Sequence, residues 1–137
     1  MTWYYDGVPF EGSDTHFGFV YLIENLLTGR KYIGRKYFTC AGYRQINGKK
    51  KKIRKPSDWQ DYWGSNETLK REVEATGKEN YRRIILRLCN SKSECAYFET
   101  YEIMSRHALL SETYYNSWVT AKIRKEHLKS IVQHNKM

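Results

Sequence analysis

The sequence lacks the features that mark several common classes of protein. Its three cysteines, Cys40, Cys89 and Cys95, include no CxxC pair, which argues against a disulfide framework and a structural zinc site and favours free buried thiols. No apolar run approaches the roughly 18 residues of a membrane span, and the N-terminus has neither the basic start nor the apolar centre of a signal peptide. The sequence therefore predicts a soluble, cytoplasmic protein with no membrane partner.

Signatures of several catalytic classes are missing as well. The four histidines occur in neither an HxxxH nor an H-N-H spacing, so neither a histidine-metal nuclease nor a zinc enzyme is supported. The chain has no glycine-rich phosphate loop, which argues against ATP-driven chemistry. These absences leave charge and aromatic content as the informative features of the composition.

The charge balance points to a polyanionic partner. The chain carries 24 lysines and arginines against 15 aspartates and glutamates, with a formal net charge of +9 and a pI near 9.5, and a strongly basic surface attracts nucleic acid. The length of 137 residues suits one domain, so we expect a single domain over residues 1–137. Aromatic residues make up 15% and supply large apolar area for a core.

Three segments have the composition of β-strands. Residues 17–24 and 31–35 are rich in β-branched and aromatic side chains and flank a turn segment at 25–29, which predicts a β-hairpin. Residues 81–89 (YRRIILRLC) are typical of a mostly buried central strand. Residues 1–16 show no clear period, and we expect them to form an N-terminal arm that lies over the fold.

A first helix is predicted between two recognisable ends. Leu69 and Val73 recur at helical spacing, Ser65 or Asn66 is the candidate N-cap, and Gly77 is the expected stop. The spacing therefore predicts a short amphipathic helix before the third strand.

Two further helices are expected after that strand. Ser91 and Glu94 form a capping box that begins a helix running to about residue 107. A last basic helix is expected over about residues 119–133, within a C-terminal segment at 117–137. The predicted class is therefore α+β, a small central antiparallel three-stranded sheet flanked by helices.

A block of positive charge and an aromatic cluster separate the hairpin from the first helix. Six of the seven residues at 49–55 (KKKKIRK) are basic, and such a block repels itself, so we expect a solvated loop. It would contact phosphates and add affinity rather than sequence specificity. The nearby Trp59, Tyr62 and Trp63 are more typical of a core than of a base-stacking platform. The expected DNA-contacting residues are Arg44, Lys49, Lys50, Lys51, Lys52, Arg54 and Lys55.

Glu99 lies where an isolated carboxylate would be costly. At 100° per residue it shares the apolar stripe of its helix with Ala96 and Ile103, so it faces the sheet. A carboxylate there must pair with a cation, for which Arg106 is one candidate, or bind a metal. Glu102 lies at the opposite margin of the stripe, so helical geometry alone does not choose between the two glutamates.

The predicted hairpin carries the tripeptides FVY and YIG, which end at Tyr21 and begin at Tyr32, 11 residues apart. This pattern resembles the GIY-YIG nuclease family, in which a hairpin brings two such tyrosines together, although the first tripeptide departs from the family name at its two leading positions. Residues 59–88 resemble small phage-encoded members, including homing-type endonucleases. The resemblance covers about residues 17–116 and is specific in its ordered combination of motifs.

The resemblance implies a Mg²⁺-dependent DNA endonuclease, with Mn²⁺ as a substitute, and a set of site residues. The family carries a glutamate on the helix after the third strand and a later asparagine, which here are Glu99 as metal ligand and Asn116 as supporting amide, although Asn116 could equally cap or turn the chain. Arg35, Lys36 and Arg44, in that order, are candidates to contact the scissile phosphate. The implied catalytic residues are Tyr21, Tyr32, Arg35, Lys36, Glu99 and Asn116, with either tyrosine as general base.

Two interpretations of function follow. In the first, one site hydrolyses one DNA strand and leaves 5′-phosphate and 3′-hydroxyl ends, as the resemblance implies, and the protein acts as a monomer or transient dimer on DNA. A phage-encoded protein of this kind would act in the host cytoplasm in a homing-like or DNA-degrading role. In the second, the chain is a non-catalytic basic nucleic-acid-binding module whose tyrosines belong to the core and whose Glu99 sits in a buried ion pair.

Overall fold

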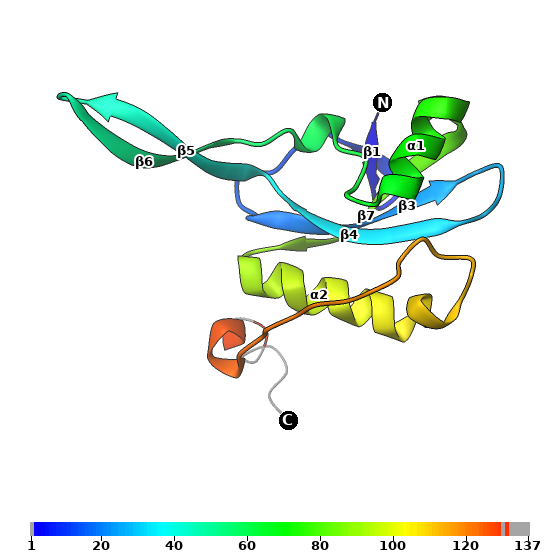
Figure 1. Ribbon diagram of the computed structural model, residues 1–137. Coiled ribbons are helices and arrows are strands. Elements are labelled where there is room, and N and C mark those ends of the chain that lie inside the picture. Colours follow the sequence, from blue (N-terminus) through cyan, green and yellow to red (C-terminus); the bar gives the residue numbers. More distant parts are fainter. Residues whose placement is uncertain (1, 130, 132–137) are drawn as a thin grey trace.

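A central β-sheet with helices on both faces organises the chain, as the computed structural model shows for residues 2–129 and 131 (Figure 1). The sheet has the strand order β2-β1-β7-β3-β4. Helix α1 (Glu67–Thr76) covers one face and α2 (Lys92–Ser105) the other (Figure 1). The strands are β1 (Trp3–Tyr5), β2 (Val8–Phe10), β3 (Gly18–Asn25), β4 (Lys31–Tyr37) and β7 (Tyr81–Cys89). Within the described residues, no helix has the length and apolar character needed to cross a membrane.

The three predicted strands are confirmed, but the sheet is larger than predicted. β3 pairs antiparallel with both β4 and β7, whereas β1 pairs parallel with β7, so the sheet is mixed and five-stranded. Within the segment expected as an arm over the fold, residues 3–10 instead form the β1–β2 hairpin, which extends the sheet edge. Strands of three residues are too short to show a period, although Asp6 and Gly7, with φ of 55° and 81°, have the left-handed conformations of a tight hairpin turn.

The N-terminal strand is fastened to the core by aromatic contacts. The buried Trp3 donates its indole N–H to the carbonyl oxygen of Trp59 at 2.8 Å. The guanidinium of Arg83 lies between the rings of Trp3 and Trp63, 4.5 and 4.4 Å from their centroids. Trp59 is itself buried, with Tyr62 and Trp63 packed against the same cluster, so the interpretation of these aromatic residues as core is confirmed.

Each face of the sheet builds its own hydrophobic core. Along β3, alternate residues enter opposite cores, with Phe19 and Tyr21 facing α1 and Val20 and Leu22 facing α2. Both faces are therefore covered, which explains why β3 is almost continuously buried. The three cysteines are free. Cys89 and Cys95 are buried in the α2-side core, and Cys40 is half-buried.

The caps of both helices follow the sequence prediction. Asn66, rather than Ser65, is the N-cap of α1 and accepts a hydrogen bond from the Leu69 N–H at 3.0 Å. Gly77 ends α1 with φ of 97°. At the start of α2, the Ser91 hydroxyl accepts from the Glu94 N–H at 3.1 Å, and the Glu94 carboxylate accepts from the Asn90 N–H at 3.3 Å.

The C-terminal helix predicted to begin near Val119 does not begin there. Residues 117–124 have no regular structure, and a short 3-10 turn follows at Lys125–Leu128. The preceding residues are held extended along the edge of β4, and Val119, Thr120 and Ile123 are β-branched residues of modest helix propensity. The remainder of the predicted helix, residues 130 and 132–133, lies outside the described residues.

The prediction of a basic loop at 49–55 is wrong, because these residues form a strand. β5 (Thr39–Ile46) and β6 (Lys49–Pro56) pair antiparallel as a two-stranded ribbon that projects away from the sheet (Figure 1). Asn47 and Gly48 turn between them with φ of 53° and 74°, and Asn-Gly is a strong hairpin signal. A ribbon that packs neither face against a core satisfies its backbone while its lysines stay in water, so charge repulsion did not preclude a strand.

We expect Trp3→Ala to lower the free energy of unfolding by about 3 to 5 kcal/mol, because it removes a buried indole from the core. Its neighbour Tyr4 is more exposed, so Tyr4→Ala is a matched control that should cost about 1 kcal/mol or less. Urea unfolding followed by circular dichroism measures both. Equal, small losses would mean that the first residues are a loose arm rather than part of the sheet.

Candidate active site

A cleft of about 600 Å³ lies at the outer edge of β4. β4 has a sheet neighbour on one side only, which is β3. On its other side a short segment runs parallel to it, with the Lys31 N–H donating to the Thr113 carbonyl at 2.9 Å and the Tyr115 N–H donating to the Lys31 carbonyl at 2.7 Å. Because β4 is an edge strand, side chains from both faces of the sheet can meet around it.

Tyr21 and Tyr32 lie side by side in this cleft, with ring centroids 6.2 Å apart. Tyr21 belongs to β3 and pairs in register with Gly34 of β4. A Cβ on Gly34 would fall on the Tyr21 hydroxyl and ring carbons. The phenol of Tyr21 therefore crosses over Gly34 to reach the edge of the sheet, and a residue with a side chain at position 34 would block it.

An irregularity in β7 lies beside Tyr21. The register of β3 on β7 shifts between Val20, which pairs with Arg87, and Tyr21, which pairs with Ile85. The extra residue, Leu86, makes a β-bulge, a feature that commonly re-aims side chains next to functional sites. The bulge also breaks the two-residue alternation of β7, because Leu86 and Arg87 both serve the α2 side.

The two phenols differ in how firmly they hold their protons. Burial raises the pKa of Tyr21 well above its ordinary value of 10. Burial also raises the pKa of Tyr32, but the hydrogen bond between its hydroxyl and that of Ser65, at 3.0 Å, acts in the opposite direction. Both tyrosines are therefore protonated at neutral pH, and Tyr32 is the easier one to deprotonate.

Glu99 enters the cleft from α2 and pairs with Arg35 of β4, with 3.4 Å between Oε1 and the guanidinium nitrogen. Burial raises the pKa of the Glu99 carboxyl, and the nearby Arg35 charge opposes that shift. Arg106, the candidate partner of Glu99, instead pairs with Glu102 at 2.9 Å, and Arg87 pairs with the same carboxylate at 3.2 Å. The structure thus assigns Glu99 to the cleft and Glu102 to an ion-pair cluster outside its lining.

Asn116 fastens the edge of β4 through its side-chain amide. Its Oδ1 accepts from the Ile33 N–H at 2.9 Å, and its Nδ2 donates to the Ile33 carbonyl at 2.8 Å. The amide therefore continues the hydrogen-bond ladder begun by the backbone of the neighbouring segment. Ile33 lies between Tyr32 and Gly34, so this pair of bonds fixes the backbone that carries both.

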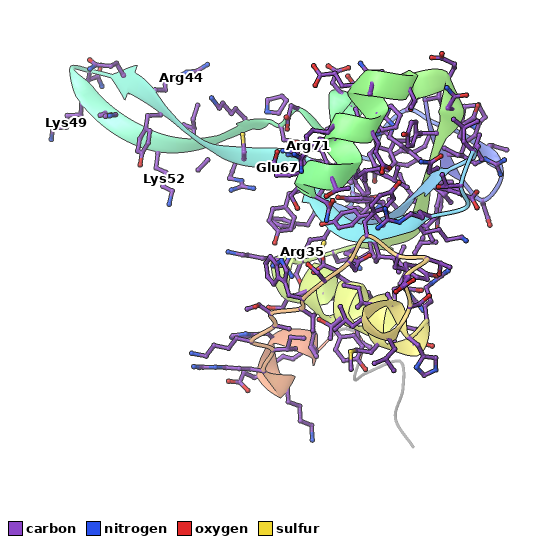
Figure 2. The ribbon with its side chains drawn as sticks, turned by 45° about the vertical axis from the view of Figure 1, so that its right-hand side comes forward. Arg35, Arg44, Lys49, Lys52, Glu67 and Arg71 are labelled. Carbon is purple, nitrogen blue, oxygen red and sulfur yellow. The ribbon has the colours of Figure 1, made fainter. Side chains whose placement is uncertain are left out.

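Two of the three candidate phosphate contacts lie outside the cleft lining. Lys36 points to the other face of β4, where its ammonium lies 2.6 Å from an Asp58 carboxylate oxygen and 4.1 Å from the centroid of the Tyr62 ring. Arg44 lies on the β5–β6 ribbon, away from Arg35 (Figure 2). Of these candidates, only Arg35 lines the cleft. The basic residues at 49–55 belong to β6, apart from the cleft.

Several further cleft residues were missed in the sequence, among them Ser65, Asn66 and Trp118. Ser65 bonds to Tyr32, and Asn66, besides capping α1, donates from Nδ2 to the Tyr115 carbonyl at 3.2 Å. In the sequence, a role as helix N-cap already explained the polar side chains of these two residues, so no pattern indicated that they belong to the site. Trp118, 73% exposed, also lines the cleft. An exposed indole shortly after Asn116 was the one available signal.

The cleft suits a hard divalent cation rather than a metal that needs several protein ligands. Glu99 is the one acidic residue among those lining it, and no cluster of three or more His, Cys, Asp or Glu side chains occurs among residues 2–129 and 131. Mg²⁺ retains several waters and binds through one or two carboxylates plus substrate phosphates. The donor set therefore fits Mg²⁺ and does not fit zinc.

A comparison with known families identifies the family of the chain. The family model described as "Putative endonuclease segE, GIY-YIG domain" matches residues 3–119. The chain therefore belongs to the GIY-YIG family, whose members are endonucleases that hydrolyse phosphodiester bonds. This membership favours the nuclease over the non-catalytic binding module. Comparisons with curated proteins and with solved structures give no significant match.

Gly34→Ala should lower the free energy of unfolding by about 1 to 3 kcal/mol, because the added methyl group collides with Tyr21. The cost should largely disappear in a Tyr21→Ala background, where the obstructing ring is absent. Gly42→Ala is the matched control, since a Cβ there meets only the flexible side chain of Lys55. Chemical unfolding of the parent, the two single variants and the double variant measures the coupling, and an unchanged cost in the Tyr21→Ala background contradicts the crossing of the ring over Gly34.

Glu99→Gln should make the metal-free protein more stable at neutral pH. Because the folded-state pKa of Glu99 is raised, the folded protein retains a proton that the unfolded chain loses, and stability falls as pH rises through that interval. Glutamine does not titrate, so the advantage of the variant should shrink as pH falls from neutral toward the ordinary carboxyl pKa of about 4.3 and be absent below it. Melting temperatures across pH measure this effect.

Glu102→Gln is the control for that experiment, because it leaves Arg87 and Arg106 without their carboxylate and should lower the melting temperature. A Glu99→Gln variant destabilised to the same extent would mean that the Arg35 pair, rather than burial, dominates the energetics of Glu99.

Proposed function

We propose that this endonuclease is Mg²⁺-dependent, takes DNA as its substrate and hydrolyses one strand at the β4 cleft. The observation that carries the proposal is the convergence of Tyr21, Tyr32, Arg35, Glu99 and Asn116 at one sheet edge. Side chains from two strands, one helix and the segment after it meet there. Tyr21 and Tyr32 come from the α1 side of the sheet and Glu99 from the α2 side, an arrangement that packing alone does not require.

Arg35 and Glu99 are the charged pair that would meet the scissile phosphate. Glu99 would hold Mg²⁺, with Mn²⁺ as a substitute, and the bound ion would offset the negative charge that develops on the phosphate. Arg35 would turn from Glu99 to the phosphate and clamp two of its oxygens, which orients the bond for in-line attack. Its guanidinium is part-exposed, so this movement needs no unpacking of the core.

Tyr32 is the better general base of the two tyrosines. Its hydroxyl bonds to Ser65, and its pKa is raised less strongly than that of Tyr21. A nearby cation would favour its phenolate, which would then take the proton of the attacking water. Tyr21, whose proton is held more firmly, would donate a hydrogen bond and orient the water or a phosphate oxygen. Asn116 would act through Ile33 by fixing the strand that carries Tyr32.

The family supports a further proposal about the products and the biological setting. Cleavage would leave 5′-phosphate and 3′-hydroxyl ends, and a single site would nick one strand, so a double-strand break would need a second protomer or a second visit. A phage-encoded homing-type or DNA-degrading role, exercised in the cytoplasm of the host, is the setting that we propose. Mapping of cleavage sites on a whole genome would separate the homing role from the degrading one.

We expect Tyr32→Phe to reduce single-turnover nicking of supercoiled plasmid by about 10² to 10⁴, which corresponds to roughly 2.7 to 5.4 kcal/mol of barrier. Loss of a general base has this effect, whereas loss of a structural hydroxyl costs about 1 kcal/mol of folding stability. Nicking with and without Mg²⁺, beside a melting temperature, measures both. Activity within a few-fold of the parent for both Tyr32→Phe and Tyr21→Phe would overturn the mechanism.

Glu99→Gln should abolish nicking while leaving DNA affinity within a few-fold, because the basic contacts remain. Glu102→Gln is the control on the same helix and should keep its activity if it remains folded at the assay temperature. Normal cutting by Glu99→Gln together with inactivity of a folded Glu102→Gln would move the metal ligand to Glu102.

A further inference from the structure

The positive charge of the chain is concentrated on the β5–β6 ribbon. Residues 39–56 hold seven of the 24 basic residues and no aspartate or glutamate, so the rest of the chain carries a net charge of only +2 out of +9. Among the described residues, no ribbon side chain forms an ion pair with a carboxylate. The cationic ribbon residues are Arg44, Lys49, Lys50, Lys51, Lys52, Arg54 and Lys55.

The ribbon is poorly stabilised by its own contacts. Arg44 lies directly opposite Lys51, and like charges opposite each other weaken an antiparallel pair. An isolated two-stranded hairpin is at best marginally stable in water. A polyanion lying along the ribbon would remove this repulsion, so charge complementarity identifies the class of partner as nucleic acid.

The register divides the ribbon into two faces of different chemistry. Tyr43, Gln45, Lys50 and Lys52 share one face, because Tyr43 pairs with Lys52 and Gln45 with Lys50. Tyr43 is 62% exposed, and the Lys50 ammonium lies 4.6 Å from its ring centroid. Neither Tyr43 nor Gln45 packs against the core, so folding does not explain their presence. The opposite face carries Arg44 and Lys51.

The dimensions of the ribbon suit one groove of duplex DNA. The major groove, about 12 Å wide, admits a two-stranded β-ribbon, and base edges there carry a unique hydrogen-bonding pattern. Each strand of the ribbon has eight residues, which at about 3.3 Å per residue gives a reach of roughly 26 Å. That reach is about three quarters of the 34 Å helical turn of B-DNA.

Figure 2 shows that Arg44 and Lys52 leave opposite sides of the ribbon, with Lys52 on the side toward Arg35. Tyr43, which pairs with Lys52 in register, shares that face of the ribbon. A glutamine side chain can bond bidentately to adenine in the major groove, and an exposed tyrosine beside it can contact the same bases, while cationic side chains reach the phosphates.

We propose that the β5–β6 ribbon enters the major groove of duplex DNA several base pairs from the bond held in the cleft, with Tyr43 and Gln45 toward the bases and Arg44 and Lys51 on phosphates. This inference rests on the proposed DNA substrate. The sequence predicted a flexible loop here, which would add affinity without specificity. The proposal instead gives this segment a role in recognising the DNA sequence. An A-form RNA duplex, whose major groove is deep and narrow, is excluded as an equivalent ligand.

The test measures binding in a Glu99→Gln background, in which the duplex is not cut. Tyr43→Ala with Gln45→Ala should weaken binding to preferred sites by roughly 5- to 150-fold and hardly change binding to random sequence. Arg44→Gln with Lys51→Gln should weaken binding to all duplexes and flatten the salt dependence by up to about 1.8 in log–log slope. Lys78→Gln with Lys92→Gln, which removes the same charge from exposed positions on the body, should leave the slope unchanged.

Methylation interference identifies the groove. Methylation of guanine N7, in the major groove, should block binding at positions to one side of the nick, and this block should disappear in the Tyr43→Ala, Gln45→Ala variant. Three results would each overturn the proposal. They are interference from methylated adenine N3 in the minor groove, salt-dependent binding that no base methylation blocks, and equal binding to an RNA duplex. If the parent protein does not cleave DNA but shows the expected guanine N7 interference, the nuclease mechanism is refuted and the assignment of the ribbon to the major groove stands.

Discussion

The missing side chain at Gly34 is the constraint on which the cleft depends. Tyr21 belongs to an inner strand, and its phenol reaches the sheet edge only by passing over the Gly34 backbone. Because β4 is the edge strand, Arg35 on one face and Tyr32 on the other can then share one cleft with Tyr21. Asn116 satisfies the exposed backbone of Ile33 without a further full strand. An additional full strand there would have closed the edge to a substrate.

Electrostatics separates the two tasks of the molecule. In the cleft, burial raises the pKa of Tyr21, Tyr32 and Glu99, so burial favours their neutral forms and a nearby cation favours their charged forms. The cleft lining has a single cationic side chain, Arg35. The bulk of the excess positive charge lies on the ribbon instead. The cleft therefore contributes little long-range attraction for a polyanion, and the ribbon contributes much of it.

Local sequence patterns predicted most of the helices and strands whose formation depends on neighbouring residues. The hairpin, the third strand and both α-helices follow from composition, period and caps. The β1 strand escaped notice because three residues carry no period and its parallel partner lies about 80 residues away. The basic strand β6 escaped notice because its charge pattern outweighed the Asn-Gly turn. Beyond residue 116, β-branched residues and the extended segment before them prevented the early start of a helix.

The site could be predicted in part, for similar reasons. The helical periodicity predicted that Glu99 faces the sheet, and the family resemblance identified the two tyrosines and Asn116. All four residues line the cleft. Arg35 and Lys36 could not be separated in the sequence, because only the strand geometry sends neighbours to opposite faces. Ser65 reaches Tyr32 from 33 positions away, and no local pattern encodes such a contact.

The junction between β4 and β5 makes the ribbon and the catalytic edge mechanically continuous. Phe38 alone separates the two strands. It is buried, its N–H donates to the Phe17 carbonyl at 3.1 Å, and its carbonyl accepts from the Ser57 N–H at 2.9 Å. With no flexible linker, a force applied to the ribbon is transmitted through Tyr37 toward Arg35. In the proposed complex with DNA, the length of the ribbon strands therefore sets how far the bound groove lies from the bond at the cleft.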